Sequence, residues 1–249
     1  MSKHKLILGD CLEELKKISD KSVDIVLTDP PYGTTQCKWD SIIPFEPMWN
    51  ELKRIIKDNG CIALFGSEPF SSALRMSNIN NYKYDWIWEK STVTGHLNAK
   101  KQPMRAYENI LVFYNNQPVY NYQKTKGHKR KVSSAESKEN CKKPEYVGKH
   151  ELTGYDSTER YPRNVINFAT DKQKSKLHPT QKPVALLEYL IKTYTNENDT
   201  VLDFTMGSGS TGVAAKNLNR KFIGIEKDQN YFNIAKDRIE GGFVFKCQK

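Results

Sequence analysis

Asp29, Pro30, Pro31 and Tyr32 place a carboxylate and an aromatic ring directly after an apolar run at residues 24–28. Proline fixes its own φ and restrains the residue before it, so we expect this tetrapeptide to be stiff and extended. The Asp29 carboxylate and the Pro30 carbonyl can accept the two N–H donors of an exocyclic amine on a nucleobase, which frees the nitrogen lone pair for attack. Tyr32 offers a face on which the base can stack, a contact worth roughly 1–3 kcal/mol. The tetrapeptide predicts an amine-activating site; a simple strand-ending turn is the alternative.

A second group of residues has the pattern of a cofactor loop. Gly207, Gly209 and Gly212 form G-x-G-x-x-G between an expected strand and an expected helix, and Glu226 follows Gly207 by 19 residues. This spacing is typical of a dinucleotide-binding loop. No Lys-Ser or Lys-Thr follows the glycines, which excludes a Walker A loop. The alternative without a ligand is a tight glycine turn beside a solvated acid.

Asp203 favours one cofactor class over the other. A carboxylate just before the glycine loop would repel the pyrophosphate of a dinucleotide but would attract a cation. S-adenosylmethionine (SAM) carries a sulfonium and an ammonium group and no phosphate. Glu226 suits both cofactors, because both carry ribose hydroxyls. We therefore predict SAM as the cofactor.

Hydrophobic periodicity predicts the elements that position these groups. We expect strands at 5–9, 24–28, 61–65, 84–88, 109–114, 200–204 and 221–226. Helices are expected from Cys11, from Phe45 to a stop at Asn59-Gly60, after Pro69, near Pro183, after the glycine loop to about Leu218, and from Asp228. This alternation predicts an α/β fold with a doubly wound, mostly parallel sheet covered by helices on both faces.

The region from about 115 to 177 lacks this pattern and is rich in lysine. Residues 121–182 hold 15 Lys and Arg against 7 Asp and Glu, or +8 of the net charge of +10. Such a block favours a polyanion, most often nucleic acid, although a solvated lysine-rich surface is the alternative. We predict Lys126, Lys129, Arg130 and Lys131 as DNA-binding residues.

Cysteine usage and apolar runs restrict the class of protein. The five cysteines are scattered without a C-x-x-C pair, so we predict no metal site and a reducing, cytoplasmic setting. The apolar runs are far shorter than the roughly 18 residues of a membrane span, and the first residues do not form a signal peptide. We therefore expect no membrane partner.

Together the motifs resemble those of the amino-methylating DNA methyltransferases, which modify adenine N6 or cytosine N4. Residues 29–32 resemble their catalytic D-P-P-Y, and residues 203–211 resemble their cofactor loop, with Phe204 one place earlier than usual. The catalytic motif precedes the cofactor loop, with the basic block between them, which is the order of the β group. The segments "GDC" at 9–11, "WIWEK" at 86–90 and "HPTQKP" at 178–183 also fit.

The resemblance implies a seven-stranded, Rossmann-like SAM-dependent methyltransferase sheet, with both motifs at its carboxyl edge. Residues 1–114 would form the catalytic half, 115–177 an inserted target-recognition region, and 178–249 the cofactor-binding half. Asp10 is expected near the adenine amino group of SAM, and Lys182 near its methionine carboxylate. The other implied cofactor-binding residues are Asp203, Phe204, Gly207, Ser208, Gly209, Thr211 and Glu226.

The implied activity is site-specific methylation of adenine N6 in DNA, by base flipping and direct in-line displacement. Asp in the first catalytic position favours adenine, and N4-cytosine is the alternative. The resemblance leaves open a homodimer and a cognate restriction endonuclease. Three other classes are alternatives. An NAD-dependent oxidoreductase leaves Asp29 and Tyr32 without a role, and RNA and protein methyltransferases usually have Asn at the position of Asp29. An inactive DNA-binding module does not account for two intact motifs.

Overall fold

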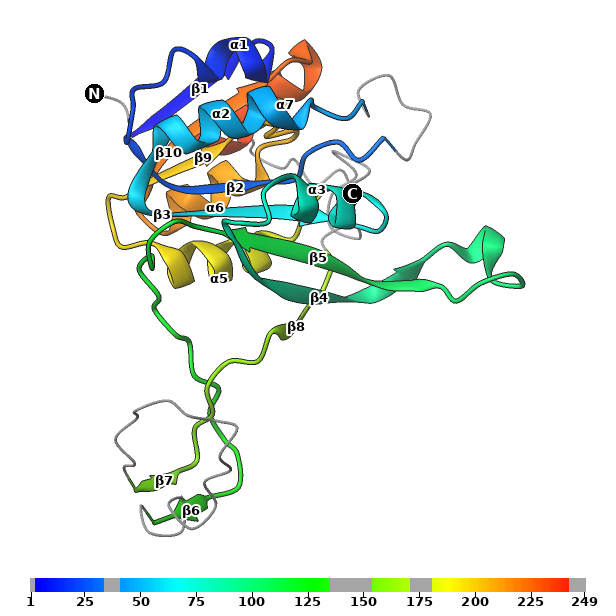
Figure 1. Ribbon diagram of the computed structural model, residues 1–249, viewed down its shortest axis with the longest axis vertical. Coiled ribbons are helices and arrows are strands. Elements are labelled where there is room, and N and C mark those ends of the chain that lie inside the picture. Colours follow the sequence, from blue (N-terminus) through cyan, green and yellow to red (C-terminus); the bar gives the residue numbers. More distant parts are fainter. Residues whose placement is uncertain (1–2, 34–40, 135–153, 171–180, 242–249) are drawn as a thin grey trace, which may run out of the picture. The chain divides into compact units, whose positions relative to one another are not determined.

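A computed structural model describes residues 3–33, 41–134, 154–170 and 181–241 of the 249-residue chain. Its centre is an eight-stranded sheet in the order β1-β10-β9-β2-β3-β5-β4-β8 (Figure 1). The strands are β1 (His4–Leu8), β2 (Val23–Thr28), β3 (Ile56–Gly66), β4 (Tyr82–Thr94), β5 (Arg105–Phe113), β8 (Val165–Phe168), β9 (Thr200–Asp203) and β10 (Lys221–Glu226). Neighbours from β1 to β3 are parallel, β5 is antiparallel to both β3 and β4, and β4 and β8 are parallel.

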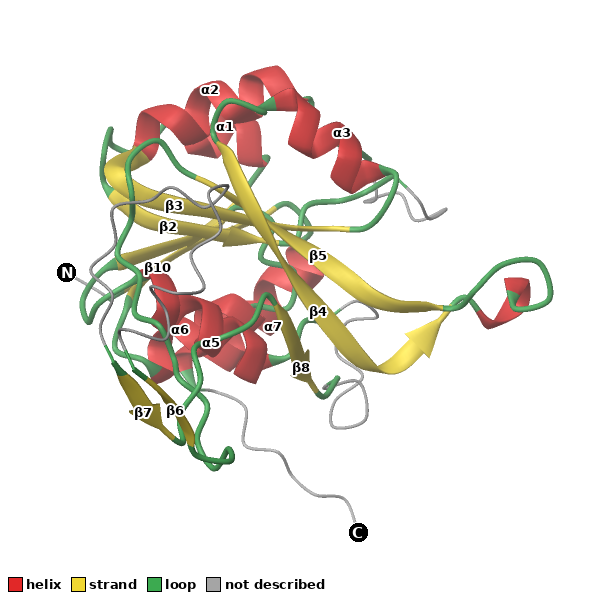
Figure 2. Ribbon diagram, turned by 60° about the horizontal axis from the view of Figure 1, so that its bottom comes forward, coloured by secondary structure: helices red, strands yellow, loops and turns green. Residues whose placement is uncertain are grey.

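Helices cover both faces of the sheet, as Figure 2 shows. One face packs against α1 (Cys11–Leu15), α2 (Phe45–Ile55) and α3 (Phe70–Ser77), and the other against α5 (Val184–Tyr194), α6 (Ser210–Asn217) and α7 (Gln229–Glu240). Consecutive residues of β2 enter opposite cores: Ile25 and Leu27 face one, and Val26 faces the other. This explains the continuous apolar run of β2, which has no exposed side that would require polar residues. The doubly wound α/β fold is confirmed.

Two details differ from the expectation. The sheet has eight strands rather than seven, because β8, from the region predicted to be inserted, pairs with β4. Helix α2 ends at Ile55 instead of at Asn59-Gly60, because Ile56 already pairs with Val23 of β2. Pairing across the sheet therefore ends the helix before the local stop signal is reached.

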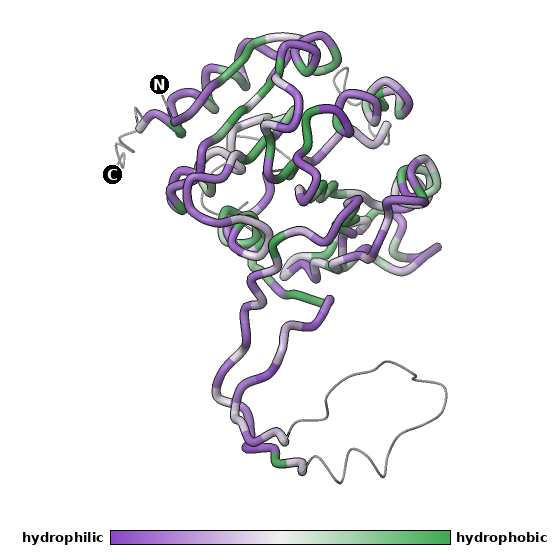
Figure 3. The backbone as a smooth tube through the Cα atoms, turned by 60° about the vertical axis from the view of Figure 1, so that its left-hand side comes forward, coloured by the Kyte–Doolittle hydropathy of each residue, from purple (hydrophilic) through white to green (hydrophobic). Residues whose placement is uncertain are grey.

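Residues Tyr122–Arg163 form a separate compact unit within the segment predicted at 115–177. The described residues of this unit are mostly hydrophilic (Figure 3). Its described part contains the antiparallel strands β6 (Lys131–Ser133) and β7 (Tyr155–Ser157), and Arg130 makes a two-pronged ion pair with Asp156 at 2.6 and 2.8 Å. Among the helices of the described chain, none is both long and apolar enough to cross a membrane.

Candidate active site

The two sequence motifs meet where β2 and β9 end side by side. The strands pair in parallel, Ile25 opposite Val201 and Val26 opposite Leu202, so Asp29 directly follows one strand and Asp203 ends the other. The Thr28 hydroxyl donates to the Asp203 carboxylate. The Thr205 hydroxyl donates to the backbone carbonyl of Asp29 at 3.1 Å. Parallel strands bring their carboxyl ends to one edge, where open α/β sheets bind ligands.

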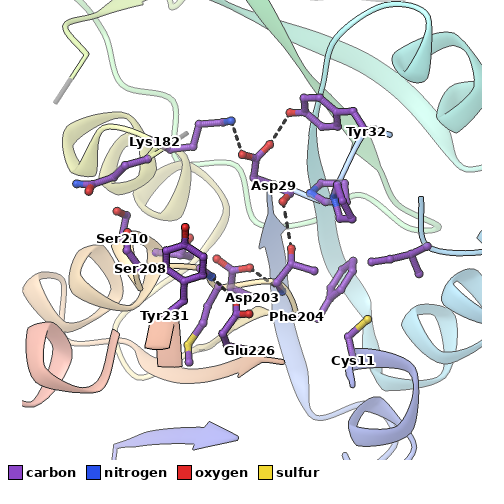
Figure 4. A pocket seen from close by; sticks show the side chains of 18 of the residues that line it. Cys11, Asp29, Tyr32, Lys182, Asp203, Phe204, Ser208, Ser210, Glu226 and Tyr231 are labelled. Carbon is purple, nitrogen blue, oxygen red and sulfur yellow. Dashed lines mark hydrogen bonds and ion pairs between the residues drawn. The ribbon is translucent and has the colours of Figure 1, made fainter. Parts of the chain in front are cut away.

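A pocket of about 570 Å³ opens at this edge and contains both motifs (Figure 4). This volume is in the usual range for a small-molecule or cofactor site. The predicted residues that line it are Asp10, Asp29, Pro30, Pro31, Tyr32, Lys182, Asp203, Phe204, Gly207, Ser208, Thr211 and Glu226. Gly209 is the remaining predicted loop residue and caps the N-terminus of α6. The structure thus brings these residues, from both ends of the chain, around one cavity.

The Asp29 carboxylate lies between a cation and a phenol, as Figure 4 shows. Lys182 forms an ion pair with one carboxylate oxygen, and the Tyr32 hydroxyl donates to the other. Burial raises the pKa of Asp29 above its ordinary value, although the Lys182 ammonium opposes the rise. Each carboxylate oxygen has a second lone pair, so Asp29 can still accept a hydrogen bond from a substrate amine.

Glu108 of β5 and Lys90 of β4 extend this ion pair into a chain of alternating charges. The Lys182 ammonium lies 3.1 Å from the Glu108 carboxylate, which also lies 3.3 Å from the Lys90 ammonium. Burial alone would raise the pKa of Glu108, but Lys182 and Lys90 outweigh it and hold that pKa below its ordinary value. Of the two carboxylates beside Lys182, burial therefore dominates the pKa of Asp29 and the neighbouring lysines dominate that of Glu108.

Lys182 forms ion pairs with two carboxylates, those of Asp29 and Glu108. The contact with the methionine carboxylate of SAM that the resemblance implies stays a prediction. Burial alone would lower the pKa of Lys182, but these two carboxylates outweigh it and raise that pKa. The lysine therefore stays charged beside the catalytic motif. Residues 178–180 of the "HPTQKP" segment lie outside the described residues.

Tyr32 packs against the ring of Phe70, the first residue of α3. The ring centroids are 5.0 Å apart and the planes are inclined by 30°. Tyr32 is half-buried and lines the pocket. The ring is therefore held by Phe70 and by its hydroxyl bond to Asp29, which fixes an aromatic wall next to the carboxylate.

Asp203 is buried at the centre of the site. Its carboxylate accepts from the Thr205 N–H at 3.2 Å, in addition to the Thr28 hydroxyl. Burial raises the pKa of Asp203 to about 6, although hydrogen bonds from Thr211 and Thr28 oppose this. The carboxylate is therefore still largely ionised at neutral pH. Among the described residues no Lys or Arg forms an ion pair with it, so a cationic ligand in the pocket could bind there.

Two glycines of the loop leave no room for a Cβ atom, and one of them, Gly209, also has a positive φ. Gly209 has φ +79°, and an added Cβ would lie 2.8 Å from the Cβ of Ala235 on α7. A Cβ on Gly212 would lie 2.3 Å from Ile239. Arg238 of α7 donates to the Ser208 carbonyl and, at 2.9 Å, to the Ser208 hydroxyl. These contacts fix the loop on α7, and Arg238 carried no motif by which the sequence could have identified it.

Glu226 and Asp10 complete the acidic side of the pocket. Glu226 accepts from the backbone N–H groups of Gly207 and Asp228, each at 2.9 Å. Burial raises the pKa of Glu226, and these N–H groups oppose the rise. Asp10 caps α1 by accepting from the Leu12 N–H at 2.9 Å, and the preceding Gly9 N–H donates to the Glu226 carbonyl at 2.9 Å. Strand pairing of β1 with β10 thus places the "GDC" segment beside the end of β10.

Phe204 and the four predicted basic residues lie in different surroundings. Phe204 is almost fully buried in the core beneath α1–α3 as well as lining the pocket, so its position one place early still brings it to the wall. Lys126, Lys129, Arg130 and Lys131 are exposed in the Tyr122–Arg163 unit, where Asp156 engages Arg130. Burial raises the pKa of Cys11, on the pocket wall, to about 11, so it is protonated at neutral pH and suits no nucleophilic role.

Comparison with known proteins gives a family and a set of relatives. The family model described as DNA methylase matches residues 23–237. The Type II methyltransferase M.HinfI of Haemophilus influenzae is 28% identical over 268 residues, covering 94% of this chain and 67% of that protein. M2.LlaDCHI of Lactococcus lactis subsp. cremoris, also a Type II methyltransferase, is 29% identical and covers 96% of this chain and 90% of that protein.

Two solved structures are also similar to this chain. The M1.HpyAVI–SAM complex has a TM-score of 0.65 and 28% identity, covering 95% of this chain and 98% of that one. The PvuII DNA methyltransferase, described as cytosine-N4-specific, has the same TM-score of 0.65 at 16% identity, covering 96% and 86% of the two chains. At that identity, the second likeness concerns the fold alone.

Proposed function

Since the chain belongs to the N6/N4 family of DNA methylases, we propose that it transfers a methyl group from SAM to the exocyclic N6 of adenine at a specific site in DNA. The observation that carries the proposal is the hydrogen bond from Thr205 to the Asp29 carbonyl, because it joins the amine-activating motif to the cofactor loop in one pocket. Asp29 in the first catalytic position favours adenine over cytosine.

The chemistry of the cofactor end fits SAM. Three carboxylates, Asp10, Asp203 and Glu226, line this part of the pocket, which would repel a phosphate and attract a cationic ligand. SAM, when bound, supplies an electrophilic methyl group on a sulfonium. We assign Asp203 to the positive end of the cofactor, and Glu226 and Asp10 to its ribose and adenine.

The catalytic end fits an amine acceptor. Asp29 and the Pro30 carbonyl would accept the two amino protons of the extruded base, and Tyr32 would stack on its ring. The prolines, the Tyr32 hydroxyl and the Lys182 ion pair hold the acceptor before substrate arrives, so little reorganisation is needed during reaction. Lys182 also favours the ionised form of Asp29, which is the form that accepts hydrogen bonds on both oxygens. The amino nitrogen loses its proton to water during or after methyl transfer, when it has become strongly acidic.

Methylation of unmodified DNA tests the proposal. The purified protein is incubated with SAM and plasmid DNA from a host without DNA methyltransferases, and the nucleosides are analysed by mass spectrometry. N6-methyladenine is expected, and single-molecule sequencing of the same DNA gives the site. Detection of N4-methylcytosine would show that cytosine, and not adenine, is the target base. The absence of any methylated nucleoside would refute the activity.

Asp29→Ala links the activity to the site. We expect a loss of at least about 100-fold in kcat, the effect of removing one preorganised group, with SAM affinity retained. Asp237→Ala, which removes an exposed carboxylate from α7, is the matched control. Turnover retained in Asp29→Ala would remove this residue from the mechanism.

A further inference from the structure

Strands β4 and β5 extend past Lys90, where the pairing of β4 with β8 ends, and residues 95–104 connect them; we call residues 91–105 the β4–β5 arm (Figures 1 and 2). Thr94 pairs with Arg105 at its base, and a short 3₁₀ turn, His96–Asn98, lies near its tip. Every residue from 91 to 103 is exposed. The inner halves of the same strands are buried and fix the arm to the sheet. The exposed residues of the arm therefore do not contribute to the hydrophobic core.

The arm begins at the wall of the active-site pocket. Lys90, Thr92 and Thr94 of β4 line that pocket, as does Glu108 of β5. A nucleic acid that has placed one base in the pocket would therefore also lie beside the arm. Sequence periodicity did not identify this element, because its exposed residues show no apolar alternation.

The charge of the arm indicates which kind of partner it binds. Between Glu89 and Glu108 the chain has four basic residues, Lys90, Lys100, Lys101 and Arg105, and no Asp or Glu. A second copy of this chain also has a net charge of +10, which disfavours contact with the arm. A phosphate backbone is complementary to it, and a two-stranded ribbon fits a DNA groove.

Leu97 gives the arm a second property. Its side chain is 98% exposed, so it contributes nothing to the folded core. Apolar side chains of this size enter base stacks in proteins that distort DNA. A base that leaves the duplex for the pocket leaves such an opening behind.

We propose that the β4–β5 arm is a DNA-binding element beside the extruded base, with Lys100 and Lys101 on phosphates and Leu97 against the vacated stack. This inference rests on the proposed function, since it takes DNA as the substrate. It adds a contact region on the main unit, distinct from the basic residues predicted at 126–131.

The salt dependence of DNA binding tests the two lysines. Each phosphate contact contributes about 0.9 to the slope of log Kd against log salt, so Lys100→Gln/Lys101→Gln should lower the slope by between about one and two. Lys53→Gln/Lys236→Gln removes the same charge from exposed positions on α2 and α7 and should leave the slope nearly unchanged. Equal slopes for the two double variants would overturn the proposal.

Leu97→Ala tests the apolar tip without risk to the fold, because the side chain is outside the core. In an oligonucleotide with the methylated sequence and 2-aminopurine at the target position, we expect less fluorescence increase on binding. We also expect kcat/KM for DNA to be about 10- to 100-fold lower, from loss of the buried apolar contact. Met76→Ala, at a 68% exposed position of α3, should behave like wild type.

Two outcomes separate the possible failures. If wild type methylates DNA while the arm variants match their controls, this inference fails and the proposed function stands. If wild type transfers no methyl group, the proposed function fails, whereas the salt slope still reports on the arm. A Leu97→Ala variant that dissociates a dimer in sedimentation, with unchanged DNA binding, would reassign the arm to contact between copies and overturn the proposal.

Discussion

The Thr205 hydroxyl donates a 3.1 Å hydrogen bond to the Asp29 carbonyl across 176 positions of the chain. A second hydrogen bond links the same segments in the opposite sense: the Thr28 hydroxyl, just before the catalytic motif, donates to the Asp203 carboxylate at the start of the cofactor loop. Each segment therefore fixes a group of the other. The contact explains why the catalytic motif can precede the cofactor loop: the site is formed by neighbouring strand ends, and chain order does not alter it. Positions of the loop and of Asp29 are therefore coupled.

Lys182→Met should move the acid limb of the kcat–pH profile to higher pH. Lys182 opposes the rise that burial causes in the pKa of Asp29, so its removal raises that pKa further. Activity requires ionised Asp29 and is lost as pH falls through this pKa, and the midpoint must therefore shift upward. The measurement is kcat against pH at saturating DNA and SAM.

Lys182→Arg and Lys90→Met are the comparison variants. Lys182→Arg keeps the charge and should largely keep the wild-type profile. Lys90 contacts Glu108 and not Asp29, so Lys90→Met should shift the acid limb less than Lys182→Met does. Removing one partner of a buried ion pair costs about 3–5 kcal/mol, so folding is checked by circular dichroism. A folded Lys182→Met enzyme with an unshifted profile would show that Lys182 does not act on Asp29.

SAM affinity should fall as pH is lowered through about 6, the pKa to which burial raises Asp203. Below that value the carboxyl is neutral and loses its attraction for the cation, by up to about tenfold in Kd per pH unit. Asp203→Asn should bind SAM weakly at pH 8 and flatten this dependence. Equilibrium dialysis between pH 5 and 8 measures both; a wild-type Kd independent of pH would contradict the assignment.

The same group predicts the pH dependence of stability without SAM. A carboxyl with a higher pKa in the folded than in the unfolded state contributes stability below about pH 4, which is lost as pH rises through about 6. Two pKa units correspond to about 2–3 kcal/mol. Relative to Asp203→Asn, wild type should therefore become less stable over this range, as measured by urea unfolding. The opposite trend would show that Asp203 is stabilised as a carboxylate.

The sequence was sufficient for what depends on local patterns. The apolar runs located the seven expected strands, and residue chemistry at 29–32 and 203–226 identified groups that the fold brings together. What it missed depends on pairing between distant segments. The contacts of Glu108 with Lys90 and Lys182 join three separate elements, and Arg238 reaches the loop from α7. A charged residue in a sequence does not reveal whether its partner is water or a buried opposite charge.

Gly209→Ala should destabilise the protein more than Gly241→Ala. Both positions have positive φ, +79° and +91°, so both substitutions carry the strain of a left-handed residue. Only Gly209 adds a clash, 2.8 Å from the Cβ of Ala235, whereas the nearest atom at Gly241 is the Lys216 ammonium at 3.6 Å. Overpacking costs typically about 1–3 kcal/mol. Thermal unfolding measures the difference, and SAM binding should weaken only in Gly209→Ala; equal unfolding would show that α7 yields to the added methyl.

Tyr32 should matter through its ring more than through its hydroxyl. Tyr32→Trp and Tyr32→Phe keep a stacking face, and Tyr32→Ala removes it, which should raise KM for DNA about 5- to 150-fold if stacking is worth 1–3 kcal/mol. Tyr32→Phe removes the donor to Asp29, so it should chiefly move the acid limb of kcat upward in pH. Because the ring also packs on Phe70 at 5.0 Å, each variant is compared with wild type by thermal unfolding before kinetics. Equal losses of kcat/KM in the Trp and Ala variants, both folded, would argue against base stacking on Tyr32.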